Sequence, residues 1–312
     1  MSSSYIRKAV EFIKVVNQLE KHPGFGLALG FSSLHVRAEQ FQFEDKTLKI
    51  KFPLTCSLLW SDSKTSNVGL LSTFAALIDE TTSLALVVAD PSRGRPGVSV
   101  VLSVEAGPGL TALTVGDEIE IISHVQRTGR NLGFTKAEIR SVPTGQLICT
   151  GSHIKFLNNY GRLGNFFLSS YGWPFFKGYC DIVLKDPAEE LSTSQSLPEL
   201  FASLENSDGS SFSFRGSPAL SSLGAPLHGG AQAVLMERAA EASLPADESL
   251  VMDSMEVEYL SSPDLQPVLK STQLPVTDGD KVVVRVELSS KGKLRSAGLF
   301  RYSRRVLPSS RL

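Results

Sequence analysis

The stretch LLSTFAALIDETTSLALVVAD, residues 70–90, is apolar along almost its whole length, and its polar residues form one island at 79–83. A helix that is apolar on all sides is buried inside a protein rather than laid on its surface. We therefore predict a central, buried helix here, with the remaining elements packed around it.

Strand-like runs lie on both sides of this helix. Residues 34–55 alternate in two runs around a Glu-Asp turn at 44–45, which is the pattern of a β-hairpin. After the helix, the turn-forming sequences GPG, TGR and PTG separate further runs at 97–106, 116–129, 131–142 and 145–157. The first half of the chain thus predicts a helix followed by an antiparallel sheet.

The same order of elements recurs in the second half. The stretch GGAQAVLMERAAEAS predicts another helix, and strand-like runs follow at 249–262, 266–277, 280–290 and 293–305. Alignment of the two helices places Asp79 opposite Glu237, and the last strands, GQLICTGSHIKF and GKLRSAGLFRYS, also match. The repeat predicts an α+β fold of two tandem modules, each an antiparallel sheet wrapped around a central helix. Joining the two sheets edge to edge removes exposed strand edges.

The repeat also sets the expected domain boundaries. Residues 1–157 comprise an N-terminal helix and the first module, and residues 206–312 form the second module. Between them, residues 158–205 combine the aromatic stretch NFFLSSYGWPFFKGY with a polar linker. The amphipathic N-terminal helix is expected to dock on the first module. A targeting role is the alternative, but Glu11 and Glu20 are unusual in transit peptides.

Composition limits the class of protein. The chain has 312 residues, of which 42% are apolar and 20% charged, and its net charge is −1. This ordinary globular balance, without a Lys/Arg run, argues against a nucleic-acid partner, and no apolar run indicates a membrane span. The cysteines at 56, 149 and 180 show no paired spacing, which favours an intracellular location, cytoplasmic or mitochondrial. The histidines show no metal-ligand spacing, so no metal site is expected.

Two stretches carry a resemblance to a known family. LHGGAQAVLME in the second copy, and the run from ALIDETTSLALVVAD to SHIKFL in the first, look like the hotdog-fold acyl-CoA thioesterases of the PaaI type. The resemblance covers about residues 5–157 and, more weakly, about 210–305. It implies a His-Gly-Gly motif at the start of the hotdog helix, a catalytic carboxylate further along that helix, and a serine in the next strand.

The implied motif is divided between the two copies. The first copy has Asp79 at the acid position and Ser99 at the serine position, but the residues at 70–72 are Leu-Leu-Ser instead of His-Gly-Gly. The second copy keeps His228, Gly229 and Gly230. Its acid position holds Glu237, and its serine position falls near Met252.

Helix geometry decides how these halves combine. The start of the helix and its acid position are about 13 Å apart, so both cannot act on one carbonyl from the same helix. We therefore expect His228 and Gly229 to face Asp79 and Ser99 across the interface between the modules, as the resemblance also implies. The other pairing, Glu237 against residues 70–72, is expected to be degenerate.

The expected chemistry is hydrolysis of an acyl-CoA thioester. Backbone N–H groups at a helix N-terminus carry partial positive charge and can hold the developing oxyanion, and Gly229 allows close approach. Asp79 would activate a water or attack directly, and Ser99 would help to hold that water. An apolar pocket is expected to raise the pKa of Asp79.

Further expectations concern the substrate and the assembly. CoA itself is part of the substrate, so no separate cofactor is expected, and the family's tetramers of single modules suggest a homodimer of this double-module chain. The aromatic stretch is expected to pack over the sheets, with a lid over an acyl tunnel as the alternative. Candidate contacts to CoA are Gly230, Arg93, Arg95 and Lys155, with Arg304 and Arg305 as further cations.

Two other functions remain open from the sequence. A hotdog hydratase or dehydratase also uses a histidine and an acid. A non-catalytic acyl-CoA-binding or scaffold protein would explain the loss of His-Gly-Gly from the first copy. The spacing of nine residues from the histidine to the acid, with the match of the first copy, favours hydrolysis over a hydratase. Retention of only the two complementary halves argues against a decayed binding protein.

Overall fold

The protein is described from a computed structural model of the whole chain. The described residues are 2–19, 24–29, 38–55, 58, 71–89, 95, 97–157, 166–169, 171–183, 196–222, 226–245 and 250–304.

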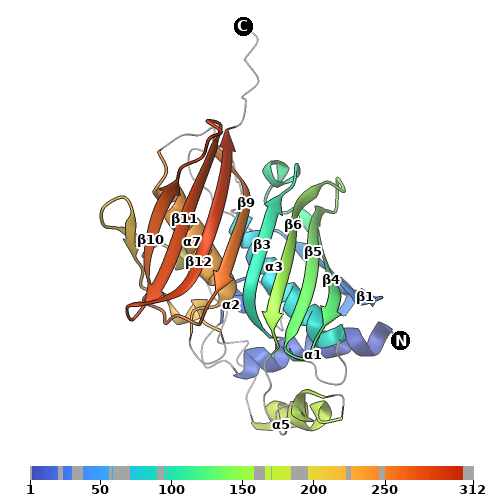
Figure 1. Cartoon of the computed structure of the whole chain (residues 1–312). Coiled ribbons are helices and arrows are strands. Elements are labelled where there is room, and N and C mark those ends of the chain that lie inside the picture. Colours follow the sequence, from blue (N-terminus) through green and yellow to red (C-terminus); the bar gives the residue numbers. More distant parts are fainter. Residues whose placement is uncertain are drawn as a thin grey trace.

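One continuous antiparallel sheet runs through both halves of the chain (Figure 1). Its order is β1-β2-β4-β5-β6-β3-β9-β12-β11-β10-β8-β7. The strands of the first half are β1 (Phe41–Glu44), β2 (Thr47–Pro53), β3 (Val98–Ala106), β4 (Glu118–Thr128), β5 (Leu132–Ser141) and β6 (Leu147–Phe156). Those of the second half are β7 (Glu205–Asn206), β8 (Ser211–Ser213), β9 (Leu250–Tyr259), β10 (Val268–Leu274), β11 (Lys281–Ser290) and β12 (Lys293–Arg304). The predicted hairpin and both predicted sets of strands are confirmed.

The two halves join where β3 pairs with β9. Five residue pairs form this junction, and Ser103 opposite Glu256 is the central one. The side chains of these two residues also hydrogen-bond at 3.0 Å. Because each half contributes its equivalent strand, the junction relates the modules by a pseudo-twofold axis and leaves neither strand with a free edge. The predicted joined sheet is confirmed.

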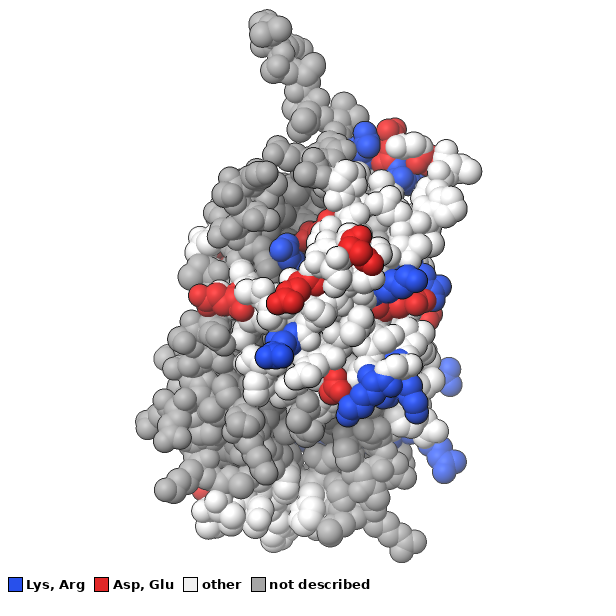
Figure 2. Space-filling model, turned by 90° about the vertical axis from the view of Figure 1, so that its left-hand side faces the viewer, with Lys and Arg blue, Asp and Glu red and all other residues white. Residues whose placement is uncertain are grey.

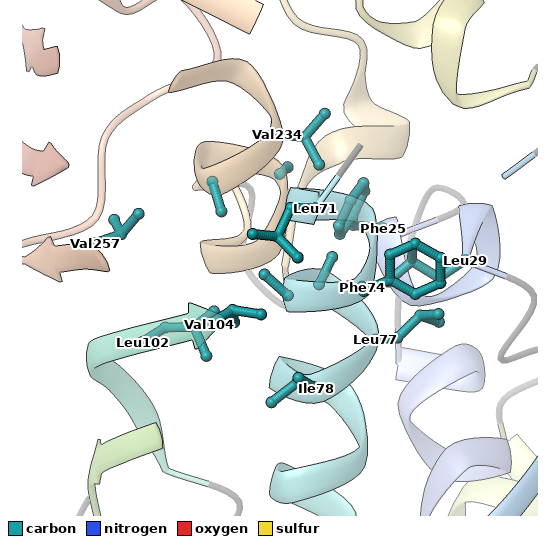
Figure 3. Packing of buried hydrophobic residues seen from close by; sticks show 14 of the residues in the cluster. Phe25, Leu29, Leu71, Phe74, Leu77, Ile78, Leu102, Val104, Val234 and Val257 are labelled. Atoms are coloured by element: carbon teal, nitrogen blue, oxygen red, sulfur yellow. The ribbon is translucent and has the colours of Figure 1, made fainter. Parts of the chain in front are cut away.

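The central helices of the two modules lie side by side against the sheet. Helix α3 (Leu71–Ala89) and helix α7 (Gly229–Ala242) pack against each other, and both contact strands of their own half. In Figure 3, Leu102 and Val104 of β3 lie on one side of α3, while Phe25 and Leu29 lie on the other. Nearly every residue of α3 is buried, as its apolar sequence predicts.

Helix α3 is also long and apolar enough to cross a membrane, and no other helix among the described residues meets that test. Most of it is enclosed within the protein core, where a helix of this composition serves the fold.

The N-terminal helix α1 (Ser2–Leu19) packs against α3, as expected, and contributes Ala9 and Ile13 to the main core. Helix α5 (Trp173–Val183) holds much of the aromatic stretch and lies against α1 (Figure 1). Trp173 stacks on Phe12 and donates a hydrogen bond to Glu11 at 2.9 Å. The expectation that this stretch packs over the sheets is therefore wrong. Trp173 finds both an aromatic partner and an acceptor for its N–H on α1.

Shorter elements complete the described chain. They are α2 (Phe25–Ala28), α6 (Leu197–Leu200) and the 3-10 turns η1 (Ala38–Gln40), η2 (Leu110–Ala112) and η4 (Pro218–Leu220). Acidic and basic side chains are interspersed on the face shown in Figure 2, in keeping with the near-zero net charge.

Candidate active site

A pocket of about 800 Å³ opens where the middle of α3, at Asp79, meets the start of α7, at Gly229. Both modules contribute to its wall, which also includes Ser99, Lys155 and Tyr259. The structure thus brings the two separated halves of the motif into one cavity.

Asp79 is buried, and its two carboxylate oxygens have different surroundings. The Oδ1 atom accepts hydrogen bonds from Ser99 Oγ at 2.9 Å and from Lys155 Nζ at 2.8 Å. The Nε2 atom of His153 lies 3.6 Å from the same oxygen. The Oδ2 atom accepts no hydrogen bond from the described residues and faces Gly229. One oxygen is therefore anchored, and the other is available to a substrate.

These neighbours decide the charge of Asp79. Burial alone would raise its pKa, but the Lys155 ammonium, with His153 and His228, outweighs burial and holds the pKa far below its usual range. The expectation of a raised pKa is therefore wrong. It took account of desolvation, but not of a buried lysine at hydrogen-bond distance.

Gly229 lies where α7 begins, directly opposite this carboxylate. A Cβ atom placed on it would sit 2.9 Å from Asp79 Oδ2 and 3.2 Å from Ser99 Oγ. Among the described residues no group accepts a hydrogen bond from the Gly229 N–H. Its carbonyl accepts a hydrogen bond from Tyr259 at 3.1 Å. The site thus combines a bare N–H at a helix N-terminus with a facing carboxylate oxygen.

His228 is the N-cap of α7, and its Nδ1 accepts the Gly230 N–H at 3.1 Å. Its Nε2 lies 3.0 Å from Glu80 Oε1, and its ring packs against Phe25. Burial alone would lower the pKa of His228, but the carboxylates of Glu80 and Asp79 outweigh it and raise the pKa.

Two of the residues expected to contact CoA have partners within the protein. Lys155 is buried against Asp79, and it also donates to Ser83 at 2.5 Å. Arg95 is buried, and its guanidinium donates to the Arg130 carbonyl at 2.8 Å. Both side chains are thus buried against other groups of the protein, and a contact of either with CoA stays a prediction.

The remaining candidates give no further support to a CoA contact. A Cβ on Gly230 would meet Ala76 of the facing helix at 2.8 Å, which indicates that the glycine allows α3 and α7 to pack closely. Arg304 is exposed at the end of β12. Arg93 and Arg305 lie outside the described residues.

The equivalent place on the other side of the pseudo-twofold axis is arranged differently. Glu237 is buried, and its two carboxylate oxygens accept the backbone N–H groups of Leu71 at 3.2 Å and Ser72 at 2.6 Å. Glu237 therefore faces the start of α3, as expected, at Leu71 and Ser72. Leu70, the third residue of the expected pairing, lies outside the described residues. Burial and the nearby Glu241 raise the pKa of Glu237 to about 8.

The strand register identifies what replaces the neighbours of Asp79 on this side. Ser99 and Met252 each lie four residues before their strand's member of the central β3–β9 pair, Ser103 and Glu256. Met252 therefore occupies the position of Ser99. The β3–β6 and β9–β12 registers then place Tyr302 at the position of Lys155 and Phe300 at that of His153. No member of the anchoring set is repeated.

Sequence reasoning missed three members of the Asp79 site. They are Glu80, His153 and Tyr259. Glu80 stood in the polar island that drew attention to Asp79. His153 precedes Lys155 by two positions on one strand, so the two share a face.

Comparison with known proteins places the chain in a family. It is 32% identical to acyl-coenzyme A thioesterase 13 of Mus musculus over 108 residues, which are 34% of this chain and 74% of that protein. It is also 32% identical to the Homo sapiens protein of the same name over 106 residues, 33% of this chain and 72% of that protein. The chain belongs to the hotdog-fold thioesterase family. It is a thioesterase, and thioester hydrolysis is its class of reaction.

Solved structures share the fold of this hotdog thioesterase. The 12:0-ACP thioesterase of Umbellularia californica superimposes with a TM-score of 0.53 at 12% identity, covering 83% of this chain and 95% of that one. A hot dog fold protein of unknown function from Alicyclobacillus acidocaldarius gives 0.51 at 12% identity, covering 86% and 96%. No family model matches the chain. Each superposition includes nearly the whole of the similar chain, so the double-module arrangement of this thioesterase matches theirs.

Proposed function

We propose that the protein hydrolyses acyl-CoA thioesters at one composite site, formed by Asp79 and Ser99 of the first module and His228 and Gly229 of the second. The observation that carries this proposal is the pairing of a free carboxylate oxygen, Asp79 Oδ2, with the Gly229 N–H across the module interface. Relatives named acyl-coenzyme A thioesterase 13 support CoA as the thiol of the substrate.

The proposed reaction begins with the thioester carbonyl oxygen against the Gly229 N–H. This donor, at the positive end of the α7 dipole, stabilises the negative charge that develops on that oxygen. Asp79 Oδ2 takes a proton from a water that attacks the carbonyl carbon. The tetrahedral intermediate then collapses and expels the CoA thiolate, leaving the free acid.

Direct attack by Asp79 Oδ2 on the carbonyl carbon is the second route open to the same oxygen. This attack would break the C–S bond, expel the CoA thiolate and leave a mixed anhydride of Asp79 and the acyl group, which water then hydrolyses. A label on the Asp79 carboxylate after a single turnover in ¹⁸O-labelled water would identify this route. Attack by water labels the product acid in the first turnover, whereas direct attack places the first label on the enzyme carboxylate if water attacks at that carbonyl.

The site around Glu237 is proposed to be inactive. Both of its carboxylate oxygens are occupied by the N–H groups of Leu71 and Ser72, the donors that an oxyanion would need. The carboxylate therefore closes its own oxyanion hole. Its raised pKa further lowers the fraction that is ionised at neutral pH.

The pocket also favours one orientation of the substrate. Phe12, Ile13 and Val16 of α1, with Leu84 of α3, give the pocket an apolar wall, and Ser261 and Ser262 line it as well. We place the acyl chain against α1 and the CoA portion toward the serines, because apolar surface favours the chain. Val16→Trp should then lower kcat/KM for long acyl chains by about tenfold while sparing short ones, a loss of about 1.4 kcal/mol. An equal effect on all chain lengths would contradict this orientation.

The test of the proposed function is release of free thiol from a panel of acyl-CoAs by the wild-type protein. Turnover with at least one member supports it. Binding of acyl-CoA without turnover, or absence of both, contradicts it.

Assembly and location are also proposed. We expect two chains to associate, which light scattering on the purified protein would test, with a monomer mass contradicting it. We also expect turnover without added cofactor or metal in a chelator-treated preparation, and an intracellular location in cells expressing a tagged chain.

A further inference from the structure

Glu80 is the residue beside the proposed base on α3, and it faces the same loop of the second module. The Asp79 carboxylate points to Gly229, whereas the Glu80 carboxylate reaches the histidine that precedes it. The side chain of Glu80 is about one-fifth exposed, so the packing of the core does not depend on its charge.

The hydrogen bonds of His228 define which ring nitrogen carries the proton. Its Nδ1 accepts the Gly230 N–H, so in the neutral ring the proton must be on Nε2. That Nε2–H points to Glu80 Oε1 at 3.0 Å, which accepts it. Glu80 therefore favours the one tautomer that can cap Gly230, while the Gly229 N–H has no acceptor among the described residues.

Protonation of His228 would break this arrangement. A ring with hydrogens on both nitrogens cannot accept the Gly230 N–H. Its Nδ1–H could then be donated to Asp79 Oδ2, which lies 3.8 Å from Nδ1 in the structure. The cationic ring would then take the oxygen that the substrate needs.

We infer that Glu80 is a positioning residue for the proposed hydrolysis, acting through His228 to hold the oxyanion-binding turn in its working form. This inference rests on the proposed function. Neutral His228 is the working form, and its protonation produces the acid limb of the activity profile.

The charged and titratable groups around His228 are consistent with that assignment. From α3, Asp79 and Glu80 favour its cation, and from β6, Lys155 opposes it. His153, also on β6, is held neutral because burial lowers its pKa to about 3. Burial raises the pKa of Tyr259 on β9, so its hydroxyl remains neutral. Asp79 has a pKa far below that of His228, so the first of the two to protonate on acidification is the histidine.

The test compares three variants with the wild type by kcat/KM across pH 5–8, and by ¹⁵N chemical shifts of the His228 ring. Glu80→Gln keeps an acceptor but removes the charge, so the acid limb should move to lower pH by about half a unit or more, with activity near neutral pH retained. Glu80→Ala should also lower kcat at neutral pH by about tenfold. His228→Asn retains a side-chain acceptor for the N-cap and cannot titrate here, so its acid limb should be absent.

The matched control is Glu105→Gln, at an exposed carboxylate on β3, which should leave the profile unchanged. The inference is overturned if Glu80→Gln has the wild-type profile, or if the neutral His228 ring carries its proton on Nδ1. The ring shifts do not depend on turnover. Failure of the proposed function would therefore show as an inactive wild type with the expected tautomer, whereas failure of this inference would show as the other tautomer.

Discussion

Helices α3 and α7 meet at two pseudo-equivalent places, in each of which an acid of one helix faces the start of the other. A comparison of these two crossings shows how one arrangement of helices can produce different sites. At one crossing, Asp79 faces Gly229 and leaves one oxygen free. At the other, the longer Glu237 reaches the start of the facing helix and accepts hydrogen bonds from Leu71 and Ser72. The extra methylene of glutamate converts a carboxylate that could serve a ligand into a cap for the facing helix.

Burial has opposite outcomes at these two carboxylates. Both are about 2% exposed, so both lose a similar amount of hydration. Asp79 has Lys155 beside it, and its pKa falls, whereas Glu237 has Glu241 nearby and Tyr302 at the position of the lysine, and its pKa rises. Burial therefore prevails at Glu237, whose module has no cation at that position of its last strand, whereas at Asp79 the Lys155 ammonium on the equivalent strand helps to outweigh it.

The largest predicted effect is the difference between the two conservative acid-to-amide changes. Asp79→Asn should lower kcat by about 10³-fold with little change in substrate binding, because it removes the base but not the shape. Glu237→Gln should leave kcat within about twofold. Steady-state thiol release measures both. If the glutamate variant is inactive and the aspartate variant active, the two sites are assigned backwards.

Gly229→Ala should come next, with a loss of about 10²-fold in kcat/KM. The variant keeps the N–H donor, but its Cβ would sit 2.9 Å from Asp79 Oδ2, where the thioester must enter. Gly279→Ala, at a turn where a Cβ meets no atom within 4 Å, is the matched control. Equal activity of the two variants would remove Gly229 from the site.

Lys155→Met should have a smaller effect that depends on pH. Without the ammonium, burial raises the pKa of Asp79, and the pKa of His228 rises as well because Lys155 no longer opposes its cation. Both changes move the acid limb upward toward neutral pH. Activity should fall by about tenfold at pH 6 and recover in part at pH 8.5, whereas Lys155→Arg should retain the wild-type profile. Loss that is uniform across this range would indicate a structural role for the lysine.

The smallest effect concerns stability rather than turnover. The folded-state pKa of Glu237, about 8, lies above its ordinary value of 4.5, so the folded protein binds more protons between these two values. Its contribution to the free energy of unfolding is complete below about pH 4.5 and is lost as the pH rises through about 8. The free energy of unfolding, obtained from thermal melts, should fall between pH 5 and pH 8.5 in the wild type. In Glu237→Gln this fall should be smaller, by up to a few kcal/mol. An unchanged difference would argue against a neutral Glu237.

Much of this arrangement could be predicted from the sequence because it depends on local patterns. The apolar run of α3 and the repeated order of helix and strands predict the double module. The division of one motif between the copies, with helix geometry, predicts that Asp79 and Gly229 meet.

What the sequence concealed depends on side chains brought together by the fold. On β6, Ile154 and Phe156 alternate with His153 and Lys155, and hydrophobic alternation would place the apolar pair inside. The structure has the reverse, with His153 and Lys155 buried. A carboxylate on α3 can stabilise a buried lysine, but that contact joins residues 76 positions apart and leaves no local signal.

Binding stoichiometry tests the central claim of one open and one closed site most directly. An acyl-CoA analogue with a methylene in place of the thioester sulfur cannot be hydrolysed, and isothermal titration calorimetry counts how many molecules bind. One molecule per chain is the predicted result, with binding weakened by Gly229→Ala and unchanged by Glu237→Gln. Two molecules per chain, or one whose binding is lost in Glu237→Gln but kept in Gly229→Ala, would contradict the account.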